Sequence, residues 1–194
     1  MDLRGCTLSH ETDESITAGI IVETEAYRQY DPACHAYNGP TMRNRNLFAA
    51  PGVAYLYLSY GIHSLINLVC EEEGYGSAVL IRAIRPTKGV EIMAERRGLK
   101  VKPKDLTNGP GKLSQALGVD TSLDGSDLAE GPLLVLWGDF DALEGEAIST
   151  TRIGITKGVE LPWRYLATGE KDVSVKPAEV SGTELRRYYQ SSSS

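Results

Sequence analysis

The chain has 194 residues, of which 41% are hydrophobic and 24% charged, close to the average for globular proteins. This length suits one domain with a sizeable core, and no apolar run approaches the roughly 18–20 residues that a membrane span needs. The formal net charge of −6 argues against a nonspecific nucleic-acid coat, although screening over about 8–10 Å leaves room for a local basic face.

The first part of the chain predicts a hairpin followed by a long loop. Apolar runs over residues 3–9 and 16–27 flank the polar residues 10–15, as in two antiparallel strands with their connection. Residues 28–46 are polar and contain two prolines and a glycine, so we expect a long ordered loop. Long loops inside compact domains tend to be functional.

A second hairpin and a further strand come next. Residues 53–60 and 64–70 are strand-like, with a tight turn at 61–63. Residues 79–85 predict another strand.

The rest of the chain predicts two helices and three short strands. The first helix covers residues 88–97 and stops at Gly98, and a basic connection over 98–111 leads to a short helix at 113–117. The later strands are expected at residues 133–137, 151–156 and 163–166.

These elements predict a single domain over residues 1–187 and a frayed tail over 188–194, which ends in four serines. The predicted fold class is α+β, with a mainly antiparallel, curved β-sheet, peripheral helices and a protruding β-hairpin. No apolar signal segment follows Met1, so we expect a cytosolic protein, cytoplasmic in a bacterium or nuclear in a eukaryote.

Charge is distributed unevenly along the chain. Nine cations and three anions lie between Arg82 and Lys112, whereas acidic residues crowd at 71–73 and 120–146. This asymmetry suits a protein that touches DNA with one side, and a solvated helix and loop is the alternative interpretation.

Glu23, Glu25 and Tyr27 share one face of the predicted strand, because side chains alternate along a strand. Two carboxylates beside an aromatic ring make a plausible catalytic edge, and an exposed strand face is the alternative. Like charges repel, so we expect one acid to be solvated or paired with a cation. The other could then have a raised pKa.

Six of the ten tyrosines lie between Tyr27 and Tyr60. Tyr55 and Tyr57 share a strand face, where core packing is the simpler explanation. Tyr60 lies at the hairpin turn, where an exposed ring gains little from burial. A wedge pushed between base pairs would give that ring a function.

His35 lies in the long loop, where a hydrogen-bonding role is commoner than catalysis. A metal site built on Glu23, Glu25 and His35 would lack the usual HxxxH or HExxH spacing. The three cysteines form no CxxC pair, so we expect no metal site and reduced, mostly buried thiols.

Arg43 and Arg45, close to Thr41, predict either phosphate contacts or an anchor for the loop. The run NGPGKLS at residues 108–114 fails the GxxxxGK[ST] spacing of a phosphate loop. We expect a tight turn that opens a helix, with free N–H groups that could hold one phosphate.

At these residues the chain resembles the alkyladenine DNA glycosylases, also called methylpurine or 3-methyladenine DNA glycosylases. The matching blocks keep the family's order and spacing from Val22 to Gly154, which is most of the chain. They are VETEAY at 22–27, ACHA at 33–36, TMRNR at 41–45, YLYLSYG at 55–61, Asn67, VLIRA at 79–83, NGPGKL at 108–113 and RIG at 152–154. The family usually has a helical segment before its first strand, whereas this chain starts almost at Leu3-Arg4-Gly5. This departure bears on stability more than on chemistry.

The resemblance implies a monofunctional enzyme of base excision repair. Such an enzyme flips a damaged purine out of double-stranded DNA and hydrolyses its bond to deoxyribose, leaving an abasic site. The implied substrates include 3-methyladenine, 7-methylguanine, hypoxanthine and ethenoadenine. The resemblance also implies no metal or organic cofactor, and we expect a monomer that binds no membrane.

The resemblance assigns the catalytic roles to three residues. Glu25 would be the general base that activates water. Arg82 and the main-chain carbonyl of Ile153 would position that water.

The resemblance also assigns binding roles. Tyr27, His35 and Tyr57 would contact the flipped base, and Asn67 would disfavour guanine by clashing with its 2-amino group. Tyr60 would insert into the gap left by the flipped nucleotide.

Two other functions stay open at this point. A non-catalytic module that binds damaged DNA would keep the tyrosines and arginines but give Glu25 no role. A metal-dependent hydrolase would use Glu23, Glu25 and His35.

Overall fold

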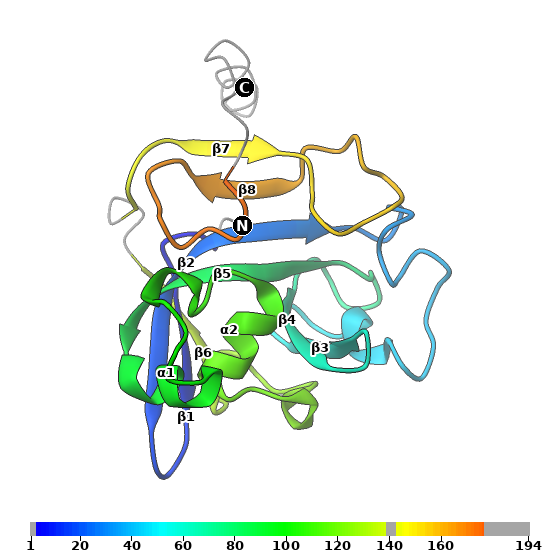
Figure 1. The fold of residues 1–194 in the computed structure, drawn as a ribbon. Helices are drawn as coiled ribbons and strands as arrows, with labels where there is room; N and C mark the ends of the chain where they lie inside the picture. Colours follow the sequence, from blue (N-terminus) through cyan, green and yellow to red (C-terminus); the bar gives the residue numbers. More distant parts are fainter. Residues whose placement is uncertain (1–2, 139–142, 177–194) are drawn as a thin grey trace.

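Strand β2 (Ile16–Tyr27) lies in the middle of the sheet and pairs with three other strands (Figure 1). The structure, a computed structural model, describes residues 3–138 and 143–176. β2 pairs antiparallel with β1 (Thr7–Glu11) along its first half and with β5 (Ala78–Lys88) along most of its length. Near its end, at residues 23–25, β2 also pairs with β8 (Arg164–Ala167). This part of β2 therefore has a neighbouring strand on each side, β5 and β8.

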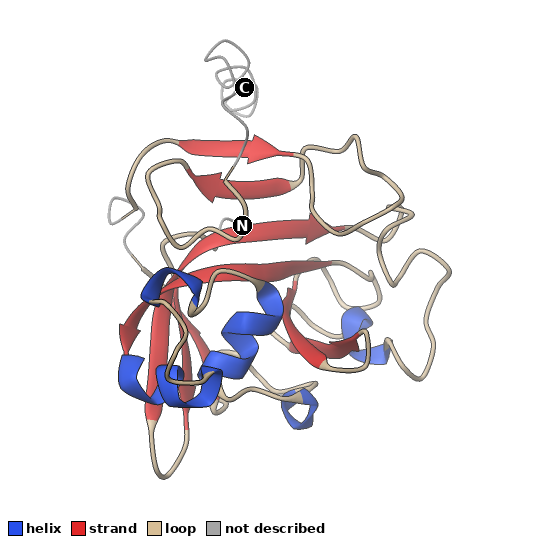
Figure 2. Cartoon of the chain, in the orientation of Figure 1, coloured by secondary structure: helices blue, strands red, loops and turns tan. Residues whose placement is uncertain are grey.

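One curled antiparallel sheet of eight strands contains all these pairings (Figure 2). Its order is β3-β4-β5-β2-β1-β6, and β8 pairs with β2 and carries β7. The other strands are β3 (Ala54–Ser59), β4 (His63–Val69), β6 (Leu133–Leu136) and β7 (Ala147–Thr150). The β2–β5 register shifts around Glu23, and such bulges bend a strand and re-aim its side chains.

Two α-helices cover one face of this sheet (Figure 1). α1 (Val90–Arg97) packs on α2 (Pro110–Leu117), and α2 rests on β4 and β5. Three short 3-10 helices lie in connections, at η1 (Arg45–Phe48), η2 (Pro103–Asp105) and η3 (Thr121–Leu123). The largest apolar cluster fills the space between helices and sheet, and it includes Leu8, Ile21, Ile66, Ile84, Leu113 and Leu117.

Most sequence predictions about the fold are confirmed. The α+β class, the antiparallel curved sheet, both hairpins, the long loop over residues 28–46 and the strand at 79–85 are all present. The first helix begins two residues later than predicted, at Val90, because β5 continues through Lys88 and Gly89 turns the backbone at φ 70°. The second begins three residues earlier, at Pro110, whose fixed φ suits a first helical turn.

The predicted strand at residues 151–156 is wrong. The strand in this region is β7, which ends at Thr150, and the following residues form an irregular loop. Gly154 has φ 78°, and the Ile153 N–H bonds to a side chain instead of a neighbouring strand. The apolar and β-branched residues at 151–156 therefore form a loop and not a strand, and its Ile153 N–H finds its acceptor in the interior of the protein.

Several smaller predictions concern the rest of the chain. Cys6 and Cys34 are buried, Cys70 is half-buried, and all three are free thiols, as expected. Within the described ranges no helix is long and apolar enough to cross a membrane. The predicted tail at 188–194 lies outside the described residues.

Candidate active site

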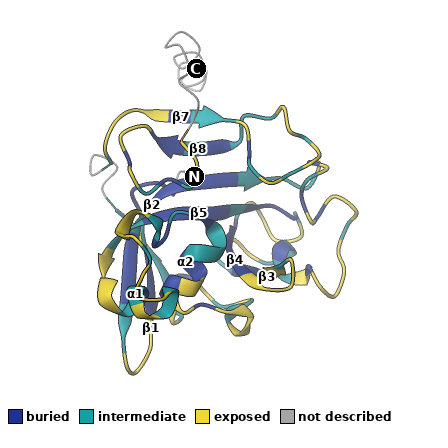
Figure 3. Ribbon diagram, in the orientation of Figure 1, coloured by how far each residue is buried: buried dark blue, intermediate teal, exposed yellow. Residues whose placement is uncertain are grey.

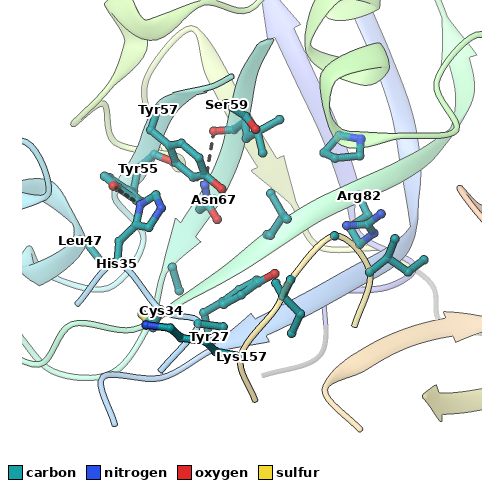
Figure 4. A pocket seen from close by; sticks show the side chains of 18 of the residues that line it. Tyr27, Cys34, His35, Leu47, Tyr55, Tyr57, Ser59, Asn67, Arg82 and Lys157 are labelled. Atoms are coloured by element: carbon teal, nitrogen blue, oxygen red, sulfur yellow. Dashed lines mark hydrogen bonds between the residues drawn. The ribbon is translucent and has the colours of Figure 1, made fainter. Parts of the chain in front are cut away.

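A cavity of about 500 Å³ opens beside the long loop, between the end of β2, the first half of β5 and strands β3 and β4. In Figure 4, His35, Tyr55 and Tyr57 stand together on one side of this pocket, with Asn67 next to Tyr57. Tyr27 and Arg82 stand on the other side. The irregular loop at 153–157 completes the wall. These residues, from six separate segments of the sequence, thus share one pocket.

Glu25 lies directly behind this wall, with no exposed surface. Its Oε1 accepts a hydrogen bond from the Ile153 N–H at 2.7 Å. Its Oε2 accepts from the Tyr27 hydroxyl at 2.8 Å and from Arg82 Nη1 at 3.1 Å. All three donors line the cavity, so the carboxylate is held by the same residues that would face a bound molecule.

Glu23 is also fully buried, which excludes the alternative of an exposed strand face. Its Oε1 accepts from Arg82 Nε at 2.9 Å and from Arg164 Nε at 2.7 Å. The Ser174 N–H and hydroxyl reach it at 2.5 and 2.7 Å. Burial opposes ionisation, but the two arginines and Ser174 hold the pKa of Glu23 below its usual value. Arg82 therefore bridges the two acids.

Tyr27 is held at its hydroxyl and at one face of its ring. Its hydroxyl donates to Glu25, and the guanidinium carbon of Arg152 lies 4.6 Å from its ring centroid. Burial and the charge of Glu25 raise the pKa of Tyr27 well above its ordinary value. The phenol thus remains a neutral donor to the carboxylate.

His35, Tyr55 and Tyr57 form an aromatic cluster. The centroids of His35 and Tyr57 are 4.4 Å apart, and His35 Nδ1 lies 2.9 Å from the Tyr55 hydroxyl. Burial and the charge of Arg43 lower the pKa of His35, so the imidazole is neutral near pH 7. Burial and the charge of Glu25 raise the pKa of Tyr57 to about 12. Tyr55 is buried in a small apolar cluster, so its packing role and its place in the cavity wall coexist.

Asn67 borders the cavity with little freedom to turn. Its Nδ2 donates to the main-chain oxygens of Tyr55 at 3.0 Å and Leu65 at 3.3 Å.

Tyr60 stands at the tip of the β3–β4 hairpin and is 91% exposed. Its backbone has φ 51°, a conformation that is uncommon for a residue with a side chain. Its ring also reaches the rim of the cavity.

Arg43 and Arg45 are exposed and lie outside the cavity wall. The residue between them, Asn44, anchors the loop: its Oδ1 accepts from the Thr41 N–H at 2.6 Å, and its Nδ2 donates to the His35 main-chain oxygen at 2.9 Å. The loop is therefore anchored by Asn44, and phosphate contact by Arg43 and Arg45 stays a prediction.

The Gly-rich run at 108–114 opens α2, as predicted. Pro110 lines the cavity, and Lys112 Nζ donates to Asn108 Oδ1 at 2.7 Å. Gly111 packs against the ring of His63, where a Cβ would come within 2.9 Å of the ring or its Cβ. The helix start is thereby tied to the hairpin that carries Tyr60.

The described part of the chain contains no group of three or more His, Cys, Asp or Glu side chains placed to hold a metal ion. Glu23 and Glu25, which the metal-dependent alternative would use, instead form ion pairs with Arg82 and Arg164.

The sequence analysis gave no role to four residues that shape the site. Asp31 and Arg152 form an ion pair with both side chains fully buried. Arg164 and Ser174 complete the surroundings of Glu23. The only signal available was general, because a buried carboxylate in a strand requires a cation somewhere in the fold.

Comparison with known proteins points in one direction. Residues 1–171 match the family described as Methylpurine-DNA glycosylase. The chain is 58% identical over 187 residues, 96% of each chain, to a Rubrobacter xylanophilus protein named "Putative 3-methyladenine DNA glycosylase". Proteins of the same name from Methanoculleus marisnigri and Carboxydothermus hydrogenoformans are 48% and 45% identical over 175 residues. These two alignments cover 89% and 90% of this chain, and 90% and 91% of the relatives.

Proposed function

The chain belongs to the methylpurine-DNA glycosylase family, hydrolases that cut N-glycosidic bonds to remove alkylated bases from DNA, and we propose how it does so. It extrudes a damaged purine from the duplex into the cavity, and Glu25 activates the water that releases the base. The proposed substrates are 3-methyladenine, 7-methylguanine, hypoxanthine and ethenoadenine, and the proposed active form is a monomer. An abasic site remains in the DNA.

The observation that carries the proposal is the hydrogen bonding of Glu25. A carboxylate offers about four acceptor positions. Three are filled, two on Oε2 and one on Oε1. The position that remains is on Oε1 beside Ile153. It is closed to solvent in the free protein, where Glu25 has no exposed surface, and we propose that a water enters with the extruded nucleotide, donates there and loses its proton to Glu25. Arg82 and the Ile153 carbonyl would orient that water.

The cavity suits a cationic base. Tyr27, His35 and Tyr57 present aromatic surface, and stacking contributes roughly 1–3 kcal/mol per base, which offsets much of the few kcal/mol needed for extrusion. The lowered pKa of His35 keeps its imidazole uncharged, so it does not repel an alkylated purine. Such a purine leaves readily, and one carboxylate to activate water then suffices.

Selectivity and DNA contact follow from the rim. Asn67 is fixed by its two hydrogen bonds and would disfavour guanine by clashing with its 2-amino group. 7-Methylguanine keeps that amino group, so its release would depend on the ease with which a cationic purine leaves. Tyr60 would fill the gap in the duplex, and a ring already 91% exposed in the free protein loses no packing by doing so. Arg43 and Arg45 would hold phosphates near the same opening.

The test is the Glu25→Gln variant, assayed for release of free methylpurines from dimethyl-sulfate-treated duplex DNA. Release should fall by about 10²-fold or more, because an amide does not accept the proton of water. Binding to the damaged duplex, measured by fluorescence anisotropy, should persist. Undiminished release by Glu25→Gln would reject Glu25 as the base. Failure of the parent protein to release the four proposed bases from duplexes that carry them would reject the substrate assignment.

A further inference from the structure

We propose that the buried ion pair between Asp31 and Arg152 positions the reacting groups, by holding both Tyr27 and Ile153 against Glu25. The inference rests on the proposed function of Glu25. Neither residue lines the cavity, so both are positioning residues whose effect passes through their neighbours.

Arg152 ties together three segments of the chain. Its Nη1 donates to Asp31 Oδ2 and to the Ala26 main-chain oxygen, the latter at 3.0 Å. Its Nη2 donates to Asp31 Oδ1 and to the Gly158 main-chain oxygen, each at 3.1 Å. One guanidinium thus joins the end of β2, the loop that carries His35 and the irregular loop at 151–158.

The same guanidinium sets the ring of Tyr27. The Arg152 guanidinium carbon lies 4.6 Å from the Tyr27 ring centroid and 5.3 Å from that of Trp163. A planar cation over an aromatic face is attractive, and burial strengthens the attraction. Because the Tyr27 hydroxyl donates to Glu25, the tilt of this ring decides where that hydrogen bond falls.

Ile153 follows Arg152 directly in the chain. The loop at 151–156 belongs to no strand, so Arg152 is its main attachment to the interior. The Ile153 N–H reaches Glu25 Oε1 at 2.7 Å. We expect this bond to depend on Arg152, which holds the preceding residue in place. A loosened Arg152 would therefore release the donor beside the one acceptor position that remains for water.

A purely structural role explains this pair poorly. Apolar side chains of similar volume are often as stabilising as a buried ion pair. The pair also leaves Arg152 Nε buried without a hydrogen-bond partner, which is unfavourable. What the ion pair supplies and apolar side chains do not is a fixed orientation of several polar neighbours at once.

The test compares Arg152→Lys, Asp31→Asn and the pair variant Asp31→Asn/Arg152→Gln with the parent protein. Base release from dimethyl-sulfate-treated duplex is measured in single turnover, and thermal midpoints are measured alongside. We expect release to fall by about 10²-fold in all three variants, because even a small misplacement of reacting groups slows a reaction by about this factor. Affinity for undamaged duplex should stay within about twofold, because the proposed phosphate contacts are made by Arg43 and Arg45.

The pair variant separates positioning from stability. It removes both charges, so it should melt closer to the parent than either single variant, while its release rate stays low. Recovery of the rate together with the thermal midpoint would overturn the proposal. If the single variants do not fold, the pair variant decides the question alone.

Glu170→Gln is the matched control. Glu170 is buried and pairs with Arg85 at 2.7 Å, away from the cavity. This variant should lower the thermal midpoint and leave release unchanged. Glu25→Gln, assayed in parallel, distinguishes the two hypotheses. Release equal to the parent in Glu25→Gln would overturn the proposed base. Normal release in Arg152→Lys beside an inactive Glu25→Gln would overturn only the positioning role of the Asp31–Arg152 ion pair.

Discussion

The two halves of β2 are buried to a similar degree but are held in different ways (Figure 3). Residues 16–21 pair with β1 and β5, and Ile21 packs into the main apolar core. Residues 22–27 pair with β5 and β8 and bury the carboxylates of Glu23 and Glu25. Burial of apolar surface is favourable by itself, whereas a buried carboxylate must find cations and donors. The first half of β2 therefore stabilises the fold, whereas the cost of burying the carboxylates in the second half must be offset by interactions elsewhere.

Replacing Glu23 by Ala should have the largest effect on stability. Arg82 and Arg164 would lose their shared acceptor and remain buried, which destabilises by about 3–5 kcal/mol in comparable cases. Urea denaturation measures this change. Base release by the folded fraction should also slow, since Arg82 would no longer be held beside Glu25.

The pH dependence of the same site sharpens the prediction. The pKa of Glu23 is lower in the folded than in the unfolded protein, where it lies near 4.5. Its ionised form therefore stabilises the fold above about pH 4.5, and this contribution is lost as the pH falls through the folded-state pKa. The stability difference between the parent and Glu23→Gln should be constant near neutral pH and shrink below pH 4.5. A difference that does not change with pH would contradict the ion pairs.

Ile21→Ala should lower stability by about 2–5 kcal/mol, because it leaves a cavity in the core. Its base release per folded molecule should match the parent, because this half of β2 holds no reacting group. A slowed reaction in this variant would mean that the two halves of the strand are not independent.

Tyr60→Ser should have the smallest effect on stability, within about 0.5 kcal/mol, because the ring is exposed. Its affinity for a lesion-containing duplex should weaken by roughly 1–3 kcal/mol, the contribution of one stacked ring. Equal affinity of Tyr60→Ser and the parent would remove the wedge.

The sequence predicted features that depend on local patterns. Alternation along residues 16–27 placed Glu23, Glu25 and Tyr27 on one face, and the resemblance assigned roles to residues that share a cavity in the structure. Those roles stay predictions. The turn at Tyr60 also followed from neighbouring residues, because Gly61 adopts the left-handed conformation that a tight turn uses.

The sequence failed where partners are distant in the chain. Arg152 pairs with Asp31, 121 residues away, and Arg164 pairs with Glu23, 141 residues away. No local pattern encodes such a choice, because each partner is selected by the assembled fold. The wrong strand at 151–156 has the same cause, since its backbone and side chains bond to the interior and not to a neighbouring strand.

The contacts of Ser174 affect how the protein can be shortened. The family match ends at residue 171, yet Ser174 donates twice to Glu23 and the Val175 carbonyl accepts from Arg164. A gene trimmed at the family boundary would encode every residue assigned a role in catalysis. It would still lack two donors to the buried Glu23 and the acceptor that holds its partner Arg164. Expression vectors, fusion junctions and affinity tags should therefore leave the chain intact through Val175.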